Sequence, residues 1–352
     1  MRHNNFKTYP LLRPVGWIYS RVMAVRNRWF DSGRLKTTAF GLPVISVGNI
    51  SAGGTGKTPM CAYLLQSLSQ AGKTPALLSR GYGRKTKGFR QVAPGDTAAL
   101  VGDEPLELYK RCGGKVAVYV CEDRCEGARQ IVAANQGVDA LVLDDAYQHR
   151  YIARDLNILL TDYSRLYAYD RVLPEGLLRE SPREAERADI VVVTKCPASL
   201  SQSEADEIAA ELRLEQRQRL FFTTVRYAEA ANFVTQAPLK KSAEDLKDTR
   251  VLVFTGIAQP TPLIDHYKSL CRSVATLHFG DHHAFSAGDI DSIARAAASA
   301  DVIITTAKDL QRLPADLPGD LGRKLYVQHI AVDFLLGRQG EFDDAVATAL
   351  NK

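Results

Sequence analysis

Cysteine is sparse in this chain of 352 residues, and its six copies are scattered. Only Cys121 and Cys125 lie close together, four positions apart, and no second pair has the spacing of a zinc site. A short fold stapled by disulfides is excluded, and a zinc module is disfavoured. We therefore expect a protein that stays in a reducing cytoplasm.

Long apolar runs are also missing. No stretch approaches the roughly 18 unbroken apolar residues that a membrane-spanning helix needs, and arginines interrupt every apolar stretch near the start, where a signal peptide would lie. The composition, 45% hydrophobic and 24% charged, is typical neither of a disordered chain nor of a membrane bundle. The length predicts about two globular domains in an enzyme-sized protein that does not cross the bilayer.

Acidic residues are almost absent from residues 1–36. This segment holds eight Lys or Arg and a single acid, Asp31, so it carries +7, whereas the whole chain carries +5. The other 316 residues therefore carry −2, and the basic character belongs to an N-terminal segment rather than to a surface for nucleic acid. We expect no nucleic-acid partner, and we infer no obligate protein partner.

Within the basic segment, residues 9–30 have the pattern of one amphipathic helix. Apolar side chains recur at three- or four-residue steps, and both tryptophans of the chain lie here. The apolar positions are Leu11, Val15, Ile18, Val22, Val25 and Trp29. One interpretation is a helix that docks on the first domain with its basic residues outward. The charge favours peripheral binding to an anionic membrane surface, because each nearby Lys or Arg contributes roughly 1 kcal/mol.

Short runs that are apolar throughout alternate with longer helical patterns over most of the chain. Such runs are typical of strands buried on both faces, in a parallel sheet that helices cover. One series lies at 43–47, 75–78, 116–120, 140–143, 157–160 and 190–193, and a second at 251–254, 274–277, 302–305 and 326–328. The pattern predicts a doubly wound, mainly parallel α/β sheet followed by a second, smaller α/β domain.

The loop after the first strand has the pattern of a P-loop. It reads Ser-Ala-Gly-Gly-Thr-Gly-Lys-Thr over 51–58, with Ser51 in place of the usual leading glycine. Its glycines permit a tight turn whose N–H groups face phosphate oxygens at a helix N-terminus. The candidate ATP-binding residues are Gly53, Gly54, Thr55, Gly56, Lys57 and Thr58. The first domain is therefore expected to be P-loop NTPase-like.

Domain boundaries follow from these two series of strands. We place the P-loop domain at 37–222, with residues 1–36 as a basic membrane-surface segment that belongs to it. The second α/β domain is expected at 223–338, and a C-terminal helix at 339–352. This helix has an apolar pattern that suits packing on either domain.

Two acids, Asp144 and Asp145, follow the strand at 140–143. Parallel strands end at the same edge of a sheet, so this pair is expected beside the P-loop, where Mg²⁺ would bind together with the hydroxyl of Thr58. An alternative is a strand-end turn with solvated acids.

Further polar clusters follow other strand ends. Arg80 and Tyr82 lie in a glycine-containing loop whose arginines suit a phosphorylated acceptor, although an ordinary basic surface loop is the alternative. Asp103 begins a helical pattern, where it could cap the helix or accept the proton of an attacking hydroxyl. Other candidate clusters are Gln148 and His149, Arg179 and Glu180, and Asp281 with His282 and His283.

Taken together, these motifs resemble the tetraacyldisaccharide 4'-kinase family along nearly the whole chain. The resemblance rests on residues 46–59, 79–83, 102–105, 144–149, 176–180, 281–282 and 305–309. One departure is Ala146, where the family has glycine after the acid pair. The resemblance implies an ATP- and Mg²⁺-dependent kinase that phosphorylates the distal sugar of an acylated disaccharide lipid A precursor, at the cytoplasmic face of the bacterial inner membrane.

The resemblance also implies roles for individual residues. Asp103 corresponds to the catalytic base and His282 to its partner from the second domain, with His283 as the fallback. Lys57 would neutralise charge on the transferred phosphoryl group. Arg80, Tyr82, Gln148, His149, Arg179 and Glu180 are expected to bind the acceptor.

The sequence also bears on two other P-loop functions. A membrane-associated ATPase switch of the deviant P-loop type carries a signature lysine near the loop start, where this chain has Ala52. A GTPase needs an Asn-Lys-x-Asp base reader, and residues 194–197, Thr-Lys-Cys-Pro, contain neither the Asn nor the Asp. Both alternatives are therefore disfavoured.

Overall fold

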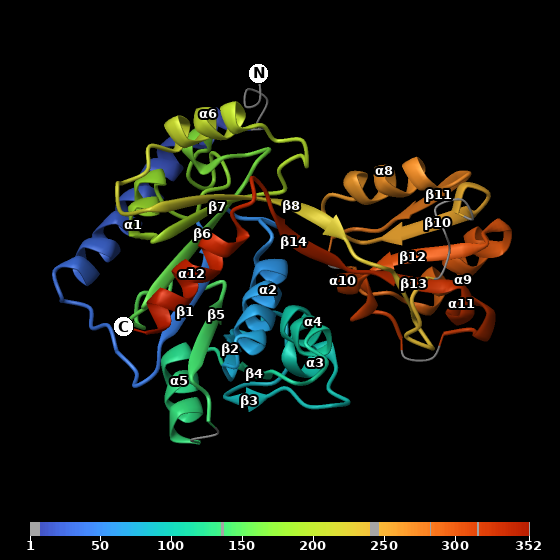
Figure 1. Ribbon diagram of the computed structural model, residues 1–352, viewed down its shortest axis with the longest axis horizontal. Helices are drawn as coiled ribbons and strands as arrows, with labels where there is room; N and C mark the ends of the chain where they lie inside the picture. Colours follow the sequence, from blue (N-terminus) through green and yellow to red (C-terminus); the bar gives the residue numbers. More distant parts are fainter. Residues whose placement is uncertain (1–7, 135–136, 240–245, 282, 315–316, 352) are drawn as a thin grey trace.

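The computed structural model describes residues 8–134, 137–239, 246–281, 283–314 and 317–351, which form two α/β domains linked by two strands (Figure 1). Within these residues nine strands form the larger sheet, in the order β14-β8-β7-β6-β1-β5-β2-β4-β3. Neighbours run parallel except at the two edges. The strands are β1 (Val44–Asn49), β2 (Pro75–Ser79), β3 (Arg90–Gln91), β4 (Ala117–Val120), β5 (Ala140–Asp144), β6 (Leu156–Asp162), β7 (Ile190–Thr194), β8 (Arg219–Tyr227) and β14 (Ile330–Phe334). The predicted doubly wound, mainly parallel α/β class is confirmed.

Helices cover both faces of this sheet, which explains why its central strands are apolar at nearly every position. Ile45 and Val47 of β1 pack into one core, whereas Val44 packs into the core on the opposite face. The first core is shared with α2 (Lys57–Gln70), α4 (Asp103–Arg111) and α12 (Gln339–Leu350), and the other face is covered by α5 (Arg124–Ala133) and α6 (Gln202–Leu212). Shorter helices are α3 (Ala98–Val101), η2 (Tyr167–Tyr169) and η3 (Pro182–Arg187).

The C-terminal helix α12 packs on the first domain. The ring of Phe342 lies 5.3 Å from that of Phe221 and 4.6 Å from that of Phe334, measured between centroids. The Tyr63 hydroxyl on α2 donates a hydrogen bond to Asp343 Oδ1 at 2.8 Å. The last helix of the chain therefore completes the core of its first domain.

The second domain has its own sheet, which within the described residues contains five strands in the order β11-β10-β12-β13-β9. Separate apolar cores lie on its two faces, one of them containing Phe254 and Ile293 and the other Val253 and Tyr267. Its strands are β9 (Ala231–Asn232), β10 (Arg250–Thr255), β11 (Ser273–His278), β12 (Val302–Thr306) and β13 (Leu325–Gln328). Its helices are α8 (Thr261–Leu270), α9 (Ala287–Ala296), η4 (Ala297–Ser299), α10 (Ala307–Leu310) and α11 (Gly319–Lys324).

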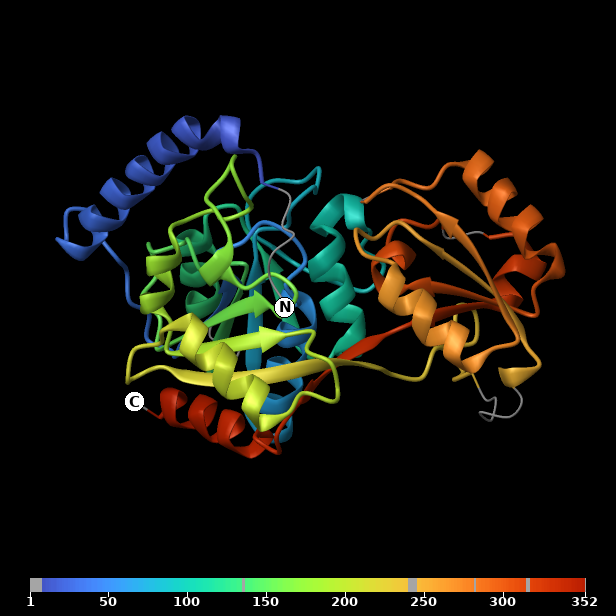
Figure 2. The same ribbon diagram turned by 90° about the horizontal axis from the view of Figure 1, so that it is seen from above.

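Strands β8 and β14 link the two domains as an antiparallel pair (Figures 1 and 2). The boundary expected between residues 222 and 223 falls inside β8, and residues 330–334, expected in the second domain, form an edge strand of the larger sheet. The pairing joins segments far apart in the sequence, so local periodicity does not place the boundary.

Helix α1 (Arg13–Asp31), preceded by η1 (Pro10–Leu12), lies on the outer surface of the first domain, away from the second domain (Figures 1 and 2). It docks through Gly16, Asn27 and Phe30, which are buried. Its apolar row faces outward instead, with Leu11, Val15, Trp17, Ile18, Val22, Val25 and Trp29 all exposed. None of the helices in the described part of the chain is long and apolar enough to span a membrane.

Candidate active site

The loop between β1 and α2 has the geometry of a phosphate-binding loop. Gly53 and Gly56 adopt φ angles of 118° and 86°, a region in which side-chain-bearing residues are strained. The side chain of Asn49 donates to Thr55 Oγ1 at 2.6 Å, which fixes the loop internally. Among the described residues, the N–H groups of residues 54 and 56–58 form no backbone hydrogen bond. They therefore form a cradle for anionic oxygens at the N-terminus of α2.

The two acids after β5 lie in opposite electrostatic settings. Asp144 is buried and accepts a hydrogen bond from Ser79 Oγ at 3.0 Å. Burial raises its pKa above the usual value, and the neighbouring Glu104 and Asp145 add to the rise. Burial by itself would raise the pKa of Asp145, but the nearby cations Lys57 and Arg179 outweigh this effect and hold the pKa below its usual value. The Asp145 carboxylate lies 3.6 Å from Lys57 Nζ and 3.1 Å from Arg179 Nη1.

These residues fit a magnesium-nucleotide complex. A carboxylate and the Thr58 hydroxyl are oxygen ligands of the kind that Mg²⁺ prefers. A bound cation would also stabilise the buried charge of Asp144, whose raised pKa reflects poor compensation by the protein. In the described part of the chain no three His, Cys, Asp or Glu side chains gather to hold a metal ion. Phosphate oxygens and water would have to complete the coordination.

Asp103 begins α4 and lies beside the loop that follows β2. Gly102 adopts a φ of 94°, and a Cβ there would lie 3.1 Å from the carbonyl oxygen of Tyr82, so the close approach of these two segments requires glycine. Gly102 also occupies the N-cap position of α4, with no side-chain hydrogen bond at the cap. The helix-capping interpretation of Asp103 is therefore not supported by the geometry.

The Asp103 carboxylate is held by the second domain. Its Oδ2 accepts a hydrogen bond from Arg312 Nε at 2.6 Å. Arg312, only 7% exposed, also lies 3.7 Å from the carboxylate of Asp309. Asp309 is itself fixed, because it accepts hydrogen bonds from the hydroxyls of Thr255 and Thr306. Arg312 was not predicted from the sequence, although it lies three residues after Asp309 in the motif at 305–309.

The structure describes only one of the two candidate histidines of the second domain. His282 lies outside the described residues. His283 Nε2 is 3.0 Å from Asp289 Oδ2, and its ring stacks on Phe279 with a centroid separation of 4.9 Å. The fallback histidine is thus engaged within its own domain.

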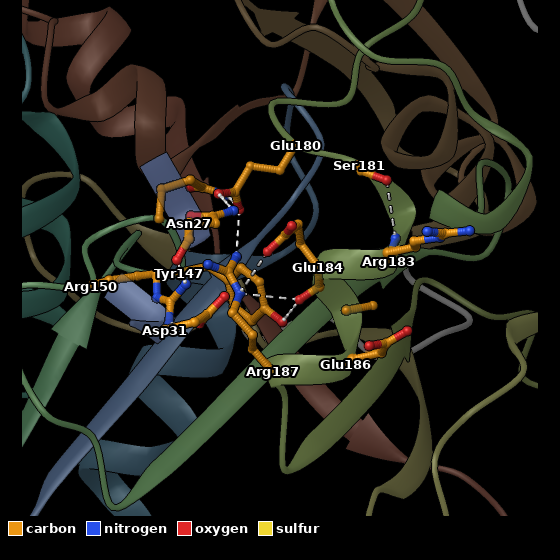
Figure 3. Close-up of polar contacts among 12 residues, drawn as sticks. Asn27, Asp31, Tyr147, Arg150, Glu180, Ser181, Arg183, Glu184, Glu186 and Arg187 are labelled. Atoms are coloured by element: carbon orange, nitrogen blue, oxygen red, sulfur yellow. Dashed lines mark hydrogen bonds and ion pairs between the residues drawn. The ribbon is translucent and has the colours of Figure 1, made fainter. Parts of the chain in front are cut away.

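The segment after residue 176 borders the phosphate-binding loop on one side and α1 on the other. The Arg179 N–H donates to the carbonyl of Ile50 at 2.7 Å, and Gln148 Nε2 donates to the carbonyl of Asn49 at 2.9 Å. Glu180 is fully buried and turns toward α1, where it accepts from Asn27 at 3.1 Å and from Arg187 at 2.5 Å (Figure 3). Arg179 and Gln148 therefore lie next to the loop, whereas Glu180 anchors α1.

The remaining predicted acceptor-binding residues are spread more widely. Arg80 and Tyr82 are exposed on the loop beside Asp103, and Tyr82 is 84% exposed. His149 Nε2 lies 4.0 Å from Cys125 Sγ, and its ring is 5.6 Å from that of Tyr151. Burial, together with the nearby cation of Arg124, lowers the pKa of His149 to about 4, so this ring is neutral near pH 7.

Two further residues support the site and were missed in the sequence. Arg124 is buried and donates to the carbonyls of Asp144 and Asp145, at 2.9 and 3.0 Å. Thr194 Oγ1 donates to the carbonyl of Thr55 at 2.9 Å. Like the other candidates, both are polar residues near the end of a strand: Thr194 ends β7, and Arg124 begins the helix after β4. This position is the signal by which they could have been found.

A phosphate-binding loop, an acid pair at the end of the adjacent strand and the carboxylate of Asp103 define a P-loop enzyme of the phosphoryl-transfer class. The family model of tetraacyldisaccharide-1-P 4'-kinase matches residues 8–351. The chain belongs to this family of kinases, and the resemblance inferred from the motifs is confirmed.

Individual relatives agree with this membership. A tetraacyldisaccharide 4'-kinase of Bacteroides thetaiotaomicron is 38% identical over 365 residues, covering 98% of this chain and 94% of the relative. A Flavobacterium johnsoniae protein of the same name is 41% identical over 336 residues, covering 96% and 95%. The crystal structure of LpxK from Aquifex aeolicus in complex with ATP has a TM-score of 0.75 at 27% identity, covering 97% of this chain and 99% of that one.

Proposed function

We propose that this protein transfers the γ-phosphoryl group of ATP to the 4'-hydroxyl of a tetraacyldisaccharide 1-phosphate, giving the 1,4'-bisphosphate in lipid A biosynthesis. The observation that carries the proposal is the placement of Lys57, Asp145 and Asp103 around one edge of the sheet, in a chain of this family. In the reaction the hydroxyl oxygen bonds to the γ-phosphorus while the bond from phosphorus to the bridging oxygen of ADP breaks, and the hydroxyl proton is removed.

The phosphate-binding loop positions the nucleotide. The N–H groups of residues 54 and 56–58 bind phosphate oxygens, and Lys57 neutralises charge that develops on the transferred group. Thr58, Asp144 and Asp145 would hold Mg²⁺, which supplies further charge neutralisation when bound. Arg179 and Arg124 support this arrangement by fixing the side chain of Asp145 and the backbone of the acid pair.

Asp103 accepts the proton of the 4'-hydroxyl, with His282 as its proposed partner. The contact with Arg312 at 2.6 Å supports a role for the second domain in aiming the Asp103 carboxylate. Because Arg312 and His282 belong to the second domain and Asp103 to the first, the two domains must be correctly docked for catalysis.

Acceptor binding is assigned mainly to Arg80 and Tyr82, because both side chains are exposed on the loop whose backbone contacts Gly102, next to Asp103. Gln148 and Arg179 shape the adjoining wall, because each bonds to the backbone at the start of the phosphate-binding loop. Glu180 and His149 act behind this wall. Their contacts with α1 and with Cys125 support a positioning role rather than direct contact with the lipid.

The protein is proposed to work peripherally at the cytoplasmic face of the inner membrane. The exposed apolar row of α1 and the +7 charge of residues 1–36 support this location. An acylated acceptor stays in the bilayer, so an enzyme that phosphorylates it must reach the membrane surface.

The direct test supplies ATP labelled in its γ-phosphate with a tetraacyldisaccharide 1-phosphate in detergent micelles. We expect a labelled bisphosphorylated lipid, and no label on a control acceptor whose 4'-hydroxyl is already phosphorylated. ATP hydrolysis at the same rate without any acceptor, and no labelled lipid, would support the membrane-associated ATPase switch instead.

A further inference from the structure

A cavity of about 640 Å³ lies between α1 and η3, lined by three acids and six arginines. The arginines are Arg21, Arg28, Arg150, Arg183, Arg187 and Arg217. Figure 3 shows Arg150 and Arg187 close to the acids Asp31, Glu180 and Glu184, with Arg183 farther along the same segment. The lining carries a net charge of +3.

Half of the positive charge is compensated within the protein. Arg150 lies 2.6 Å from Asp31, Arg187 lies 2.5 Å from Glu180 and 3.4 Å from Glu184, and Arg217 lies 3.5 Å from Asp189. The other three arginines, Arg21, Arg28 and Arg183, form no ion pair with any acid in the described ranges. Three of the six lining arginines are therefore paired within the protein and three are not, and arginines without an acidic partner suit an anion.

The neighbouring surface is apolar. A second cavity of about 500 Å³ lies on the same helix and is lined by Val22, Val25, Trp29, Leu35 and Tyr151, with Arg26 and Arg21. Arg21 lines both cavities, so the basic cavity adjoins the apolar one. A ligand that fills both must carry a negative group next to a hydrocarbon part.

The basic cavity is distinct from the site of phosphoryl transfer. Residues 177–179 bond to the start of the phosphate-binding loop, where Arg179 contacts Asp145. The chain then turns, and Glu180, Arg183 and Arg187 face α1 instead. An acceptor hydroxyl at the phosphate-binding loop would therefore lie across this segment from the cavity.

We infer that the basic cavity binds the phosphate of an anionic membrane glycerophospholipid, whose acyl chains lie along Val22, Val25 and Trp29. The inference rests on the membrane location in the proposed function, but not on the identity of the acceptor. A bound lipid would fix the orientation of α1 on the bilayer. Loose electrostatic attraction alone gives no such orientation.

The test uses dihexanoyl phosphatidylglycerol as a monomeric probe, at concentrations below those at which it forms micelles. Trp17 and Trp29 are the only tryptophans of the chain and both lie on α1, so their fluorescence reports binding. The test variant is Arg28→Gln/Arg183→Gln. The control is Arg13→Gln/Arg34→Gln, which removes the same charge from exposed positions outside the cavity.

We expect saturable binding to the wild type and to the control variant with Kd values within twofold, and a Kd at least tenfold higher for the test variant. Dihexanoyl phosphatidylcholine should bind at least tenfold more weakly than the anionic probe. Equal loss in both variants, or equal binding of the two lipids, would overturn the inference. Complete displacement of the lipid by millimolar inorganic phosphate would assign the cavity to free phosphate instead.

Kinase assays separate the cavity from the acceptor site. In neutral detergent micelles we expect the test variant to keep the kcat and the acceptor KM of the wild type. A tenfold rise in KM there would assign the cavity to the 1-phosphate of the acceptor and overturn the inference. If lipid binding follows the expected pattern but no tetraacyldisaccharide is phosphorylated, the proposed function fails while the lipid site stands.

Discussion

At the scale of single residues, the two adjacent carboxylates of the acid pair differ in their partners and in the direction of their pKa shifts. Asp144 is buried against Ser79 with a raised pKa, whereas Asp145 is paired with Lys57 and Arg179 and has a lowered one. Asp145 therefore stays charged and holds Lys57 at the loop. A bound cation would offset part of the free-energy cost of burying the charge of Asp144.

Lys57→Ala should lower kcat by about 10²-fold or more, because it removes a charge placed against the transferring phosphoryl group. Steady-state kinetics with saturating acceptor measure the effect. Lys73→Ala is the matched control, since Lys73 is exposed just after α2, and it should have wild-type kinetics. Wild-type kcat in Lys57→Ala would refute the role assigned to the loop.

Asp103→Ala should lower kcat by about 10² to 10⁴-fold with little change in the KM for ATP, because a general base acts mainly in the transition state. His282→Ala should behave similarly. If Asp103 only stabilised the helix, the variant would lose about 1 kcal/mol of stability and keep its specific activity. Comparing kcat with thermal unfolding of the same preparation decides between these outcomes.

At the scale of elements, α4 carries a buried acid whose titration affects stability. Burial raises the pKa of Glu107 to about 7, although Arg111 acts in the opposite direction. The folded state then keeps a proton that the unfolded chain releases, so this group makes stability fall as pH rises from about 4.5 to about 7.

Glu107→Gln should remove that fall, and at pH 8 the gain over the wild type should be at most about 3 kcal/mol larger than at pH 5. Thermal unfolding measured between pH 5 and pH 8 tests this. Glu215→Gln, at an exposed position, should unfold with the pH dependence of the wild type. Parallel pH profiles for the wild type and Glu107→Gln would contradict the prediction.

Helix α1 is the element expected to meet the membrane. Ile18→Gln/Val22→Gln should weaken binding to anionic vesicles by about tenfold, because it removes two exposed apolar side chains from the outward row. Val132→Gln/Val234→Gln removes two exposed valines elsewhere and should bind like the wild type. Co-sedimentation with anionic vesicles at low and high salt measures the affinity of each variant. Equal binding by the two variants would exclude α1 as the membrane contact.

At the scale of the whole molecule, the ion pair between Asp103 and Arg312 connects the two domains at the catalytic edge. Lys110 Nζ of α4 adds a hydrogen bond to Gln311 Oε1 at 2.8 Å, and Gln311 and Arg312 both lie just after α10. Domain docking and aiming of the proposed base therefore depend on the same contacts.

Arg312→Gln should lower kcat by at least tenfold and increase hydrogen exchange in both α4 and α10, because it removes an interdomain ion pair that is mostly shielded from water. Arg323→Gln is the matched control, since that side chain is 81% exposed in the same domain. A loss of activity without any change in exchange would place Arg312 in the chemistry alone rather than in docking.

The features that could be predicted from the sequence are those formed by residues close together in the chain. The glycines of the phosphate-binding loop, the acids after β5 and the apolar strands are each local patterns, and their combination was enough to indicate the family. The direction of Glu180 toward α1 and the contact of Arg312 with Asp103 depend on partners far along the chain. Sequence periodicity carries no information on such distant partners, so neither contact was predicted from the sequence.

The pairing of β8 with β14 has a consequence for synthesis. Tyr227 and Ile330 are partners in this pair, so residues 228–329 form an insertion between the arms of one hairpin. During translation the inserted domain emerges before β14 and α12 exist, and it can fold while the first domain still lacks its edge strand and last helix. Until then Phe221 lacks the rings of Phe334 and Phe342 that pack against it. The first domain is therefore the first to be synthesised in part, but it can complete its core only after the whole inserted domain has emerged.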